Sequence, residues 1–302
     1  MGAPEIPETK ALALPKTAPI ARSLAEALPG SMVFVDGRGQ VVSPGRARLQ
    51  AALGYSTRAV IGALLVGYCG ALFGWAGAAA GSVYLGYGLW NLHEWSRTMR
   101  AWRILVSDPA QAQTILTRLT RGRWRPGWVR AGAHAGLAEI AVRRGDSASA
   151  LAHYRAALAV YRKTMGGGRV HARAARHGEV IALCNLGRVN EARAAFAALG
   201  PLPGGDYLRL SWWMCELYVC LVEGGHAIDP NDLHERSRAA LGLSSGGALV
   251  ALCAWAHAVI GHDDQAEHLL AEARERSDEA ELARRFPHLH TWMLAGRSTS
   301  EP

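Results

Sequence analysis

The stretch that decides the fold is AVIGALLVGYCGALFGWAGAAAGSVYLGYGLWNL, residues 59–92, which contains no Asp, Glu, Lys or Arg. About 18 uncharged apolar residues already suggest a membrane span, and a soluble core helix rarely needs so many. One straight helix over this stretch would extend about 51 Å, well beyond a hydrocarbon layer of about 30 Å. Two spans of about 17 residues each are slightly short but workable with flanking aromatic residues, so we predict a glycine-rich transmembrane hairpin over residues 58–96.

Aromatic and basic residues flank the run as expected for two spans. Tyr55, Trp75 and Trp95 recur every 20 residues, and because aromatic rings favour the interface, Trp75 is predicted to mark the far-side turn. Arginines lie on both flanks but not inside: Arg38, Arg46, Arg48 and Arg58 precede the run, and Arg97, Arg100 and Arg103 follow it. Cytoplasmic flanks collect arginine, so both ends are predicted to face the cytoplasm of a bacterial inner membrane. One tilted or kinked span and a buried soluble helix are the alternatives.

Glycines recur at helical spacing inside the run. They are Gly67, Gly74, Gly81 and Gly88, seven residues apart, with Gly70 and Gly77 between them. Small residues on one helix face let neighbouring backbones approach closely in lipid. We interpret this face as the packing surface between the two arms, with self-association into a homo-oligomer or a small pore as the alternative. The run lacks carboxylates, lysines and arginines, which argues against ion transport.

The residues before the run divide into two parts. Residues 1–30 are rich in proline and lack the apolar core of a secretory signal, so we expect a disordered tail. Over residues 31–57 we predict a minor β-hairpin, from Met32–Val35 and Gln40–Val42 around an Asp36-Gly37 turn. A short amphipathic juxtamembrane helix opening at Pro44 is predicted to follow it.

From Asp108 onward, amphipathic helices alternate with short turns marked by glycine or proline. The clearest unit is GDSASALAHYRAAL, from Gly145. GRVNEARAAF from Gly187 and GHDDQAEHLLAEA from Gly261 repeat its pattern, and a weaker copy follows Ser107. A small alanine stands five residues after each turn, where the two helices of a unit are expected to cross. The four alanines are Ala112, Ala150, Ala192 and Ala266, and the last gap predicts a degenerate unit at about 205–243.

This pattern resembles the tetratricopeptide-repeat family over about residues 108–280. The resemblance implies an α-solenoid in a cytoplasmic domain over residues 97–296, with a capping helix near Asp278–Leu294 and a tail at 297–302. The predicted fold class is therefore all-α. Members of the family usually hold a protein partner in a groove lined by the first helix of each unit, and here the matching positions are Glu139, His177 and Trp255. Of Trp212 and Trp213, one is expected to be core, since adjacent residues do not share a helix face.

Basic and aromatic residues alternate in RLTRGRWRPGWVR, soon after the apolar run. Such a mixture suits anionic headgroups of the lipid bilayer, and a solvated loop explains it equally well; single-stranded nucleic acid is a weaker alternative. The candidate lipid-interface residues are Arg118, Arg121, Arg123, Trp124, Arg125 and Trp128.

Composition and motifs favour binding over catalysis. Half of the 302 residues are apolar and 19% are charged, which excludes a fully disordered chain, and five scattered cysteines exclude a disulfide miniprotein. We identify no nucleophile–base pair, metal constellation or phosphate loop, so we predict no enzymatic activity, metal or cofactor. The sequence predicts a membrane-anchored scaffold or adaptor that binds a protein partner. The alternative is a membrane-active or oligomer-forming protein with a regulatory repeat domain.

Overall fold

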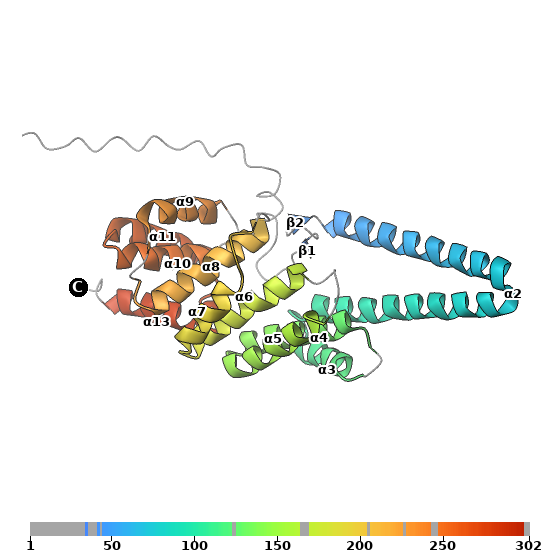
Figure 1. Cartoon of the computed structure of the whole chain (residues 1–302). Helices are drawn as coiled ribbons and strands as arrows, with labels where there is room; N and C mark the ends of the chain where they lie inside the picture. Colours follow the sequence, from blue (N-terminus) through green and yellow to red (C-terminus); the bar gives the residue numbers. More distant parts are fainter. Residues whose placement is uncertain are drawn as a thin grey trace, which may run out of the picture.

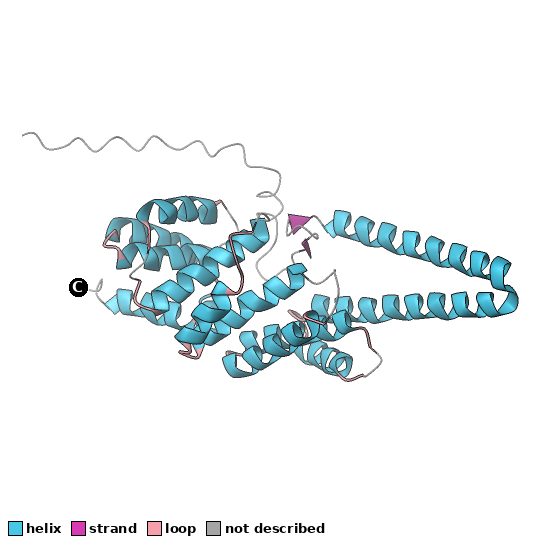
Figure 2. Ribbon diagram, in the orientation of Figure 1, coloured by secondary structure: helices cyan, strands magenta, loops and turns pink. Residues whose placement is uncertain are grey.

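A computed structural model describes residues 34–35, 41–42, 44–122, 125–163, 169–203, 206–225, 228–242 and 247–298. This described part of the chain is helical apart from turns and two short strands, in agreement with the predicted all-α class (Figures 1 and 2). Strands β1 (Phe34–Val35) and β2 (Val41–Val42) pair antiparallel, with Phe34 opposite Val42. The predicted tail 1–30 and the Asp36-Gly37 turn lie outside the described residues.

The apolar stretch lies within α2 (Pro44–Ile104), which doubles back on itself at the right of Figure 1. Gly74 interrupts the helix with φ 64° and ψ −146°, a conformation open to glycine because it has no Cβ. The two arms therefore join one residue before Trp75, which is 85% exposed. The expected short helix at Pro44 is not separate from the run, and both predicted hairpin boundaries, 57/58 and 96/97, fall inside α2. Nothing between Pro44 and Gly74 ends the helix, since proline is tolerated in the first turn.

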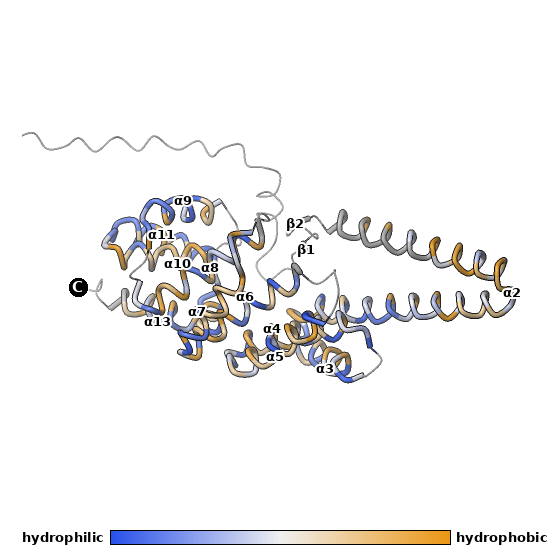
Figure 3. The backbone as a smooth tube through the Cα atoms, viewed as in Figure 1, coloured by the Kyte–Doolittle hydropathy of each residue, from blue (hydrophilic) through white to orange (hydrophobic). Residues whose placement is uncertain are grey.

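Both arms of α2 expose apolar side chains, and Figure 3 shows hydrophobic residues in orange along both arms. The large ones are Leu49, Leu53, Val60, Ile61, Leu64, Leu65, Tyr68, Leu72, Phe73, Trp75, Val83, Tyr84, Tyr87 and Leu89. Polar side chains between them bond to their own helix: Ser82 Oγ donates to the Ala78 carbonyl, and Asn91 Nδ2 to the Tyr87 carbonyl, each at 2.9 Å. Within the described residues, one helix is long and apolar enough to cross a membrane, over Val60–Ile104.

The second arm continues without a break into the helical domain. Its last turns pack on α3 (Pro109–Thr120) and α4 (Gly127–Arg143). The cluster buried between these helices comprises Ala101, Leu105, Ala112, Leu116, Leu119, Val129, Ala133, Leu137 and Ile140. The second arm of the hairpin therefore serves as the first helix of the domain, and no linker separates the two.

Nine further helices follow in the described residues, and most consecutive ones pack against each other. They are α5 (Ser147–Tyr161), α6 (Arg169–Asn185), α7 (Val189–Ala197), α8 (Asp206–Val222), α9 (Pro230–Leu241), α10 (Gly247–Val259), α11 (Asp263–Arg276), α12 (Glu279–Arg285) and α13 (Pro287–Ser298). Helices α8 and α9 occupy the region predicted for a degenerate unit.

The turns of three predicted repeats each contain a glycine with positive φ. Gly145, Gly187 and Gly261 have φ of 75°, 70° and 79°, and each ends a helix in the left-handed conformation that glycine adopts at no steric cost. Asp146 then caps α5, its carboxylate accepting from the Ser149 N–H at 2.9 Å. The alanine that follows each turn is at most 5% exposed in all four copies, which places these small residues inside the packed domain.

Four alternate helices, α4, α6, α8 and α10, contact one another in series, and we call them the inner helices. The C-terminal segment (278–298) then returns along the chain, with α13 against α10 and α12 against α4. It is not the single capping helix that was predicted. Pro287 lacks an N–H and disfavours helical geometry in the residue before it, and Phe286 accordingly has φ −136° and ψ 68° between α12 and α13.

Candidate functional site

The inner helices present side chains that hold the C-terminal segment, and we take this surface as the candidate binding site. Asn185, at the end of α6, donates through Nδ2 to the Arg285 carbonyl at 3.0 Å. The same amide nitrogen lies 3.3 Å from Ser147 Oγ, and its oxygen accepts from the Tyr218 hydroxyl at 2.6 Å. These contacts use both N–H groups of the amide and fix its orientation. Asn185 is therefore preorganised to bind the backbone carbonyl of an adjacent segment.

Aromatic contacts lie directly beside this amide. The Phe286 ring is fully buried and meets the Tyr218 ring edge-on, with centroids 5.2 Å apart at 89°, an arrangement that aromatic pairs prefer. His288 Nε2 lies 3.1 Å from the Cys184 carbonyl, and since a carbonyl only accepts, this nitrogen donates. The surface thus combines an aromatic contact with hydrogen bonds to backbone carbonyls on both sides of it.

Two of the three predicted groove residues contact the C-terminal segment. Glu139, on α4, forms an ion pair with Arg285 and a second one with Arg143 at 3.4 Å. Trp255, on α10, stacks on Trp292 of α13 with centroids 6.0 Å apart. Glu139 and Trp255 lie at opposite ends of the surface, and the C-terminal segment covers both.

His177, the third predicted groove residue, lies elsewhere. Its side chain is 5% exposed, and neither ring nitrogen has a hydrogen-bond partner among the described residues. Burial, with a smaller contribution from Arg173, lowers the pKa of His177 to about 4, so the ring is neutral near pH 7. His177 belongs to the core because helix α8 covers its side of α6, and its own carbonyl accepts from Cys215 Sγ at 3.6 Å.

Sequence reasoning missed Asn185, Tyr218, Arg285, Phe286 and His288. Local periodicity identifies Tyr218 as core but does not show what covers it. The Phe286-Pro287 dipeptide was the one available signal, because proline predicts a break in the last helix.

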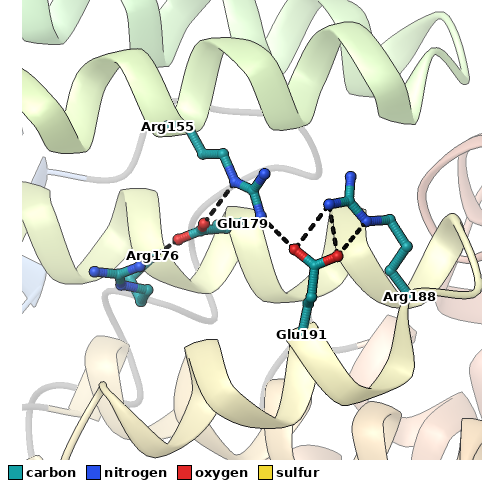
Figure 4. A network of polar contacts seen from close by, with 5 residues as sticks. All are labelled: Arg155, Arg176, Glu179, Arg188 and Glu191. Atoms are coloured by element: carbon teal, nitrogen blue, oxygen red, sulfur yellow. Dashed lines mark hydrogen bonds and ion pairs between the residues drawn. The ribbon is translucent and has the colours of Figure 1, made fainter.

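An ion-pair network on another face joins α5, α6 and α7 (Figure 4). Arg155 binds Glu179 at 3.1 Å and Glu191 at 2.9 Å, while Arg176 and Arg188 pair with the same two carboxylates at 2.5 and 2.6 Å. Hydrogen bonds from Arg188 and Arg155 lower the pKa of Glu191. The network links the helices of two consecutive hairpins and leaves its acidic groups neutralised.

The predicted lipid-interface cluster is only partly directed outward. Arg118 and Arg121 are exposed, while Arg123 and Trp124 lie outside the described residues. Arg125 is drawn inward, donating to the carbonyls of Arg118 and Arg121 and pairing with Glu94 at 2.9 Å.

The buried carboxylate of Glu94 explains why Arg125 points toward the protein. Its side chain, on the second arm of α2, is nearly fully buried and also pairs with Arg97 at 3.2 Å. A buried carboxylate requires such partners. Trp128 packs on the neighbouring Trp95 with centroids 5.2 Å apart. Arg125 and Trp128 therefore attach the hairpin to the domain instead of lying free for headgroups.

The glycines of the hairpin fall into three groups. A Cβ built at Gly81 would lie 2.7 Å from Val66 Cα on the opposite arm, and one built at Gly70 would lie 3.5 Å from the Ala78 Cβ. A Cβ built at Gly77 would lie closer still to the Cys69 carbonyl oxygen, so these three glycines lie between the arms. Gly74 forms the turn and is not a packing position. Gly67 and Gly88 meet nothing within 4 Å and face away from the opposite arm.

The cysteines, serine and histidine that could take part in catalysis are buried in the domain. Burial raises the pKa of Cys184 to about 12 and that of Cys253 to about 11, so neither thiol is a nucleophile near neutral pH. Ser237 Oγ lies 3.2 Å from His257 Nε2, but both side chains are buried and the hydroxyl also donates to the Leu233 carbonyl. Across the described ranges, no three His, Cys, Asp or Glu side chains are placed to hold a metal ion.

No protein-family model, curated protein or solved structure matches this chain.

Proposed function

We propose that this chain is a membrane-anchored scaffold that binds a protein partner at the cytoplasmic face of a bacterial inner membrane. One observation carries the anchor: the α2 hairpin extends from the domain (Figure 1), and large apolar side chains are exposed along both arms. Exposed apolar surfaces of this extent on a soluble monomer mark contact with protein or lipid. Internally bonded Ser82 and Asn91 favour lipid, where polar groups must be satisfied within the helix.

The flanking arginines support the proposed orientation of the hairpin in the membrane. Arginines flank both ends of the hairpin, and cytoplasmic loops retain arginine. The helical domain, which resembles tetratricopeptide repeats in its turns and buried alanines, would then lie in the cytoplasm. The continuous second arm and the buried Glu94–Arg125 pair would hold it close to the bilayer in a fixed orientation.

Single-cysteine labelling tests the anchor and its topology. With Cys69 replaced by alanine, we expect a cysteine at Ala78, near the turn, to react with an impermeant maleimide only from the periplasmic side. A cysteine at Ser298 should react only from the cytoplasmic side. Labelling of both positions from one side, or recovery of the full chain from a membrane-free extract, would contradict the proposal.

One observation favours a second candidate function, in which the hairpin forms oligomers. Gly67 and Gly88 have open space beside them, and such small residues permit close helix association in lipid. Gly67→Leu and Gly88→Leu should then lower the oligomer fraction in chemical crosslinking of membranes. An unchanged monomeric pattern in wild type and both variants would exclude this candidate.

A further inference from the structure

The C-terminal segment contacts the inner helices far beyond its own neighbours in sequence. A terminal capping helix covers only the last unit of a helical stack. Here α13 does contact α10, but α12 reaches back to α4, and the Glu139–Arg285 ion pair spans 146 residues. The segment therefore lies along the surface of the inner helices instead of only closing the end of the domain.

The segment is bound as a peptide ligand would be. Asn185 binds its backbone at the Arg285 carbonyl, Glu139 pairs with its charged side chain, and His288 donates to a backbone carbonyl of α6. Four of its apolar side chains, Leu282, Phe286, Leu289 and Met293, are at most 4% exposed. Backbone hydrogen bonds with apolar side chains in pockets are the general features of peptide recognition in a groove.

One of the contacts that fix the segment, its ion pair with α4, is partly open to solvent. In the Glu139–Arg285 pair, the side chains retain 19% and 31% exposure. The tether is short, because Ser277 alone separates α11 from Asp278, the N-cap of α12, and its backbone is extended with φ −126° and ψ 142°. The segment is therefore joined to α11 through a single extended residue.

We propose that the C-terminal segment is a tethered ligand that closes the partner-binding surface of the inner helices. The partner would present the same chemistry: an arginine followed directly by an aromatic residue and then by an amphipathic helix. This inference rests on the proposed partner-binding function and identifies the segment that the partner must replace.

The test uses the full chain in detergent micelles and a fluorescein-labelled synthetic peptide of residues 278–298. Arg285→Glu places a carboxylate opposite Glu139 and should release the segment while the inner helices keep their residues. We expect this variant to bind the peptide at least tenfold more tightly than wild type in fluorescence anisotropy. Arg284→Glu, an exposed neighbour on the same helix, is the matched control and should bind like wild type.

A charge swap separates release of the segment from general damage. Glu139→Arg combined with Arg285→Glu restores an ion pair within the chain, so peptide binding should return to the wild-type level. If Arg285→Glu loses its helical circular dichroism, the segment is a part of the core and the proposal is wrong. A folded Arg285→Glu variant that binds no peptide overturns it equally. Because the assay contains neither a bilayer nor a partner, failure of the membrane topology test would leave this result unaffected.

Discussion

A disulfide across the tip of the hairpin is the sharpest test of the α2 geometry. A Cβ built on Gly70 lies 3.5 Å from the Ala78 Cβ, and disulfides join Cβ atoms about 3.5–4.5 Å apart. We therefore expect Gly70→Cys with Ala78→Cys, in a Cys69→Ala background, to oxidise readily in membranes. In an uninterrupted helix these positions would be separated by about 12 Å along the axis, and no bond would form.

A larger side chain at Gly81 should weaken the packing between the two arms. Gly81→Leu drives its Cβ to within 2.7 Å of Val66 Cα, and overpacking of this kind costs about 1–3 kcal/mol. Because about 1.4 kcal/mol changes an equilibrium tenfold, the rate of disulfide formation should fall about tenfold or more. Gly88→Leu adds the same apolar side chain where nothing lies within 4 Å and should leave the rate unchanged.

The assay is copper-phenanthroline oxidation of isolated membranes, followed by mobility on non-reducing gels with and without protease cleavage between the two cysteines. Failure of the cysteine pair to oxidise would refute the hairpin. Equal loss of rate in Gly81→Leu and Gly88→Leu would show instead that glycine content, and not contact between the arms, determines the result.

Three further predictions concern the helical domain. Gly178→Ala places a methyl group too close to the Tyr154 ring at the α5–α6 contact. This variant should lower the free energy of unfolding by about 1–3 kcal/mol in denaturant melts. Gly132→Ala is the control and should be tolerated, because the nearest atom to its new methyl group is 3.6 Å away. Glu94→Gln removes the buried charge that pairs with two partly exposed arginines and should destabilise the attachment of the hairpin by about 1–3 kcal/mol, seen as faster proteolysis near residue 105; unchanged cleavage would contradict a role for the pair. His177 is neutral in the folded state down to pH about 4, whereas the unfolded chain binds the proton below pH about 6.5. Stability should therefore fall by about 1.4 kcal/mol per pH unit between these values, and His177→Leu should remove that share of the slope in melts at pH 7.5 and 5.

Much of the local structure was predictable because its causes are local. The uncharged run, its central tryptophan and its flanking arginines predicted an apolar segment that turns near Trp75, and the helix breaks at Gly74. Glycines at 145, 187 and 261 predicted the turns between helices, and the alanines after them predicted tight packing. Each of these features depends on backbone conformation or side-chain size within a few residues.

The candidate binding site was predictable only in part. The family resemblance placed Glu139 and Trp255 on one surface, and both contact the C-terminal segment. It also placed His177 there, although α8 buries that side of α6. Periodicity predicts which face of a helix is apolar, but it does not distinguish a face covered by the next helix from one left for a ligand.

The sequence by itself determined the helices, their turns and the apolar hairpin, because these depend on interactions between near neighbours. Only the tertiary structure decided that Phe286 lies against Tyr218 and that Arg285 reaches Glu139. Neither contact has a periodic signal, since the partners lie 68 and 146 residues apart. Their pairing depends on the path of every helix between them, and that path is set by packing angles accumulated along the domain.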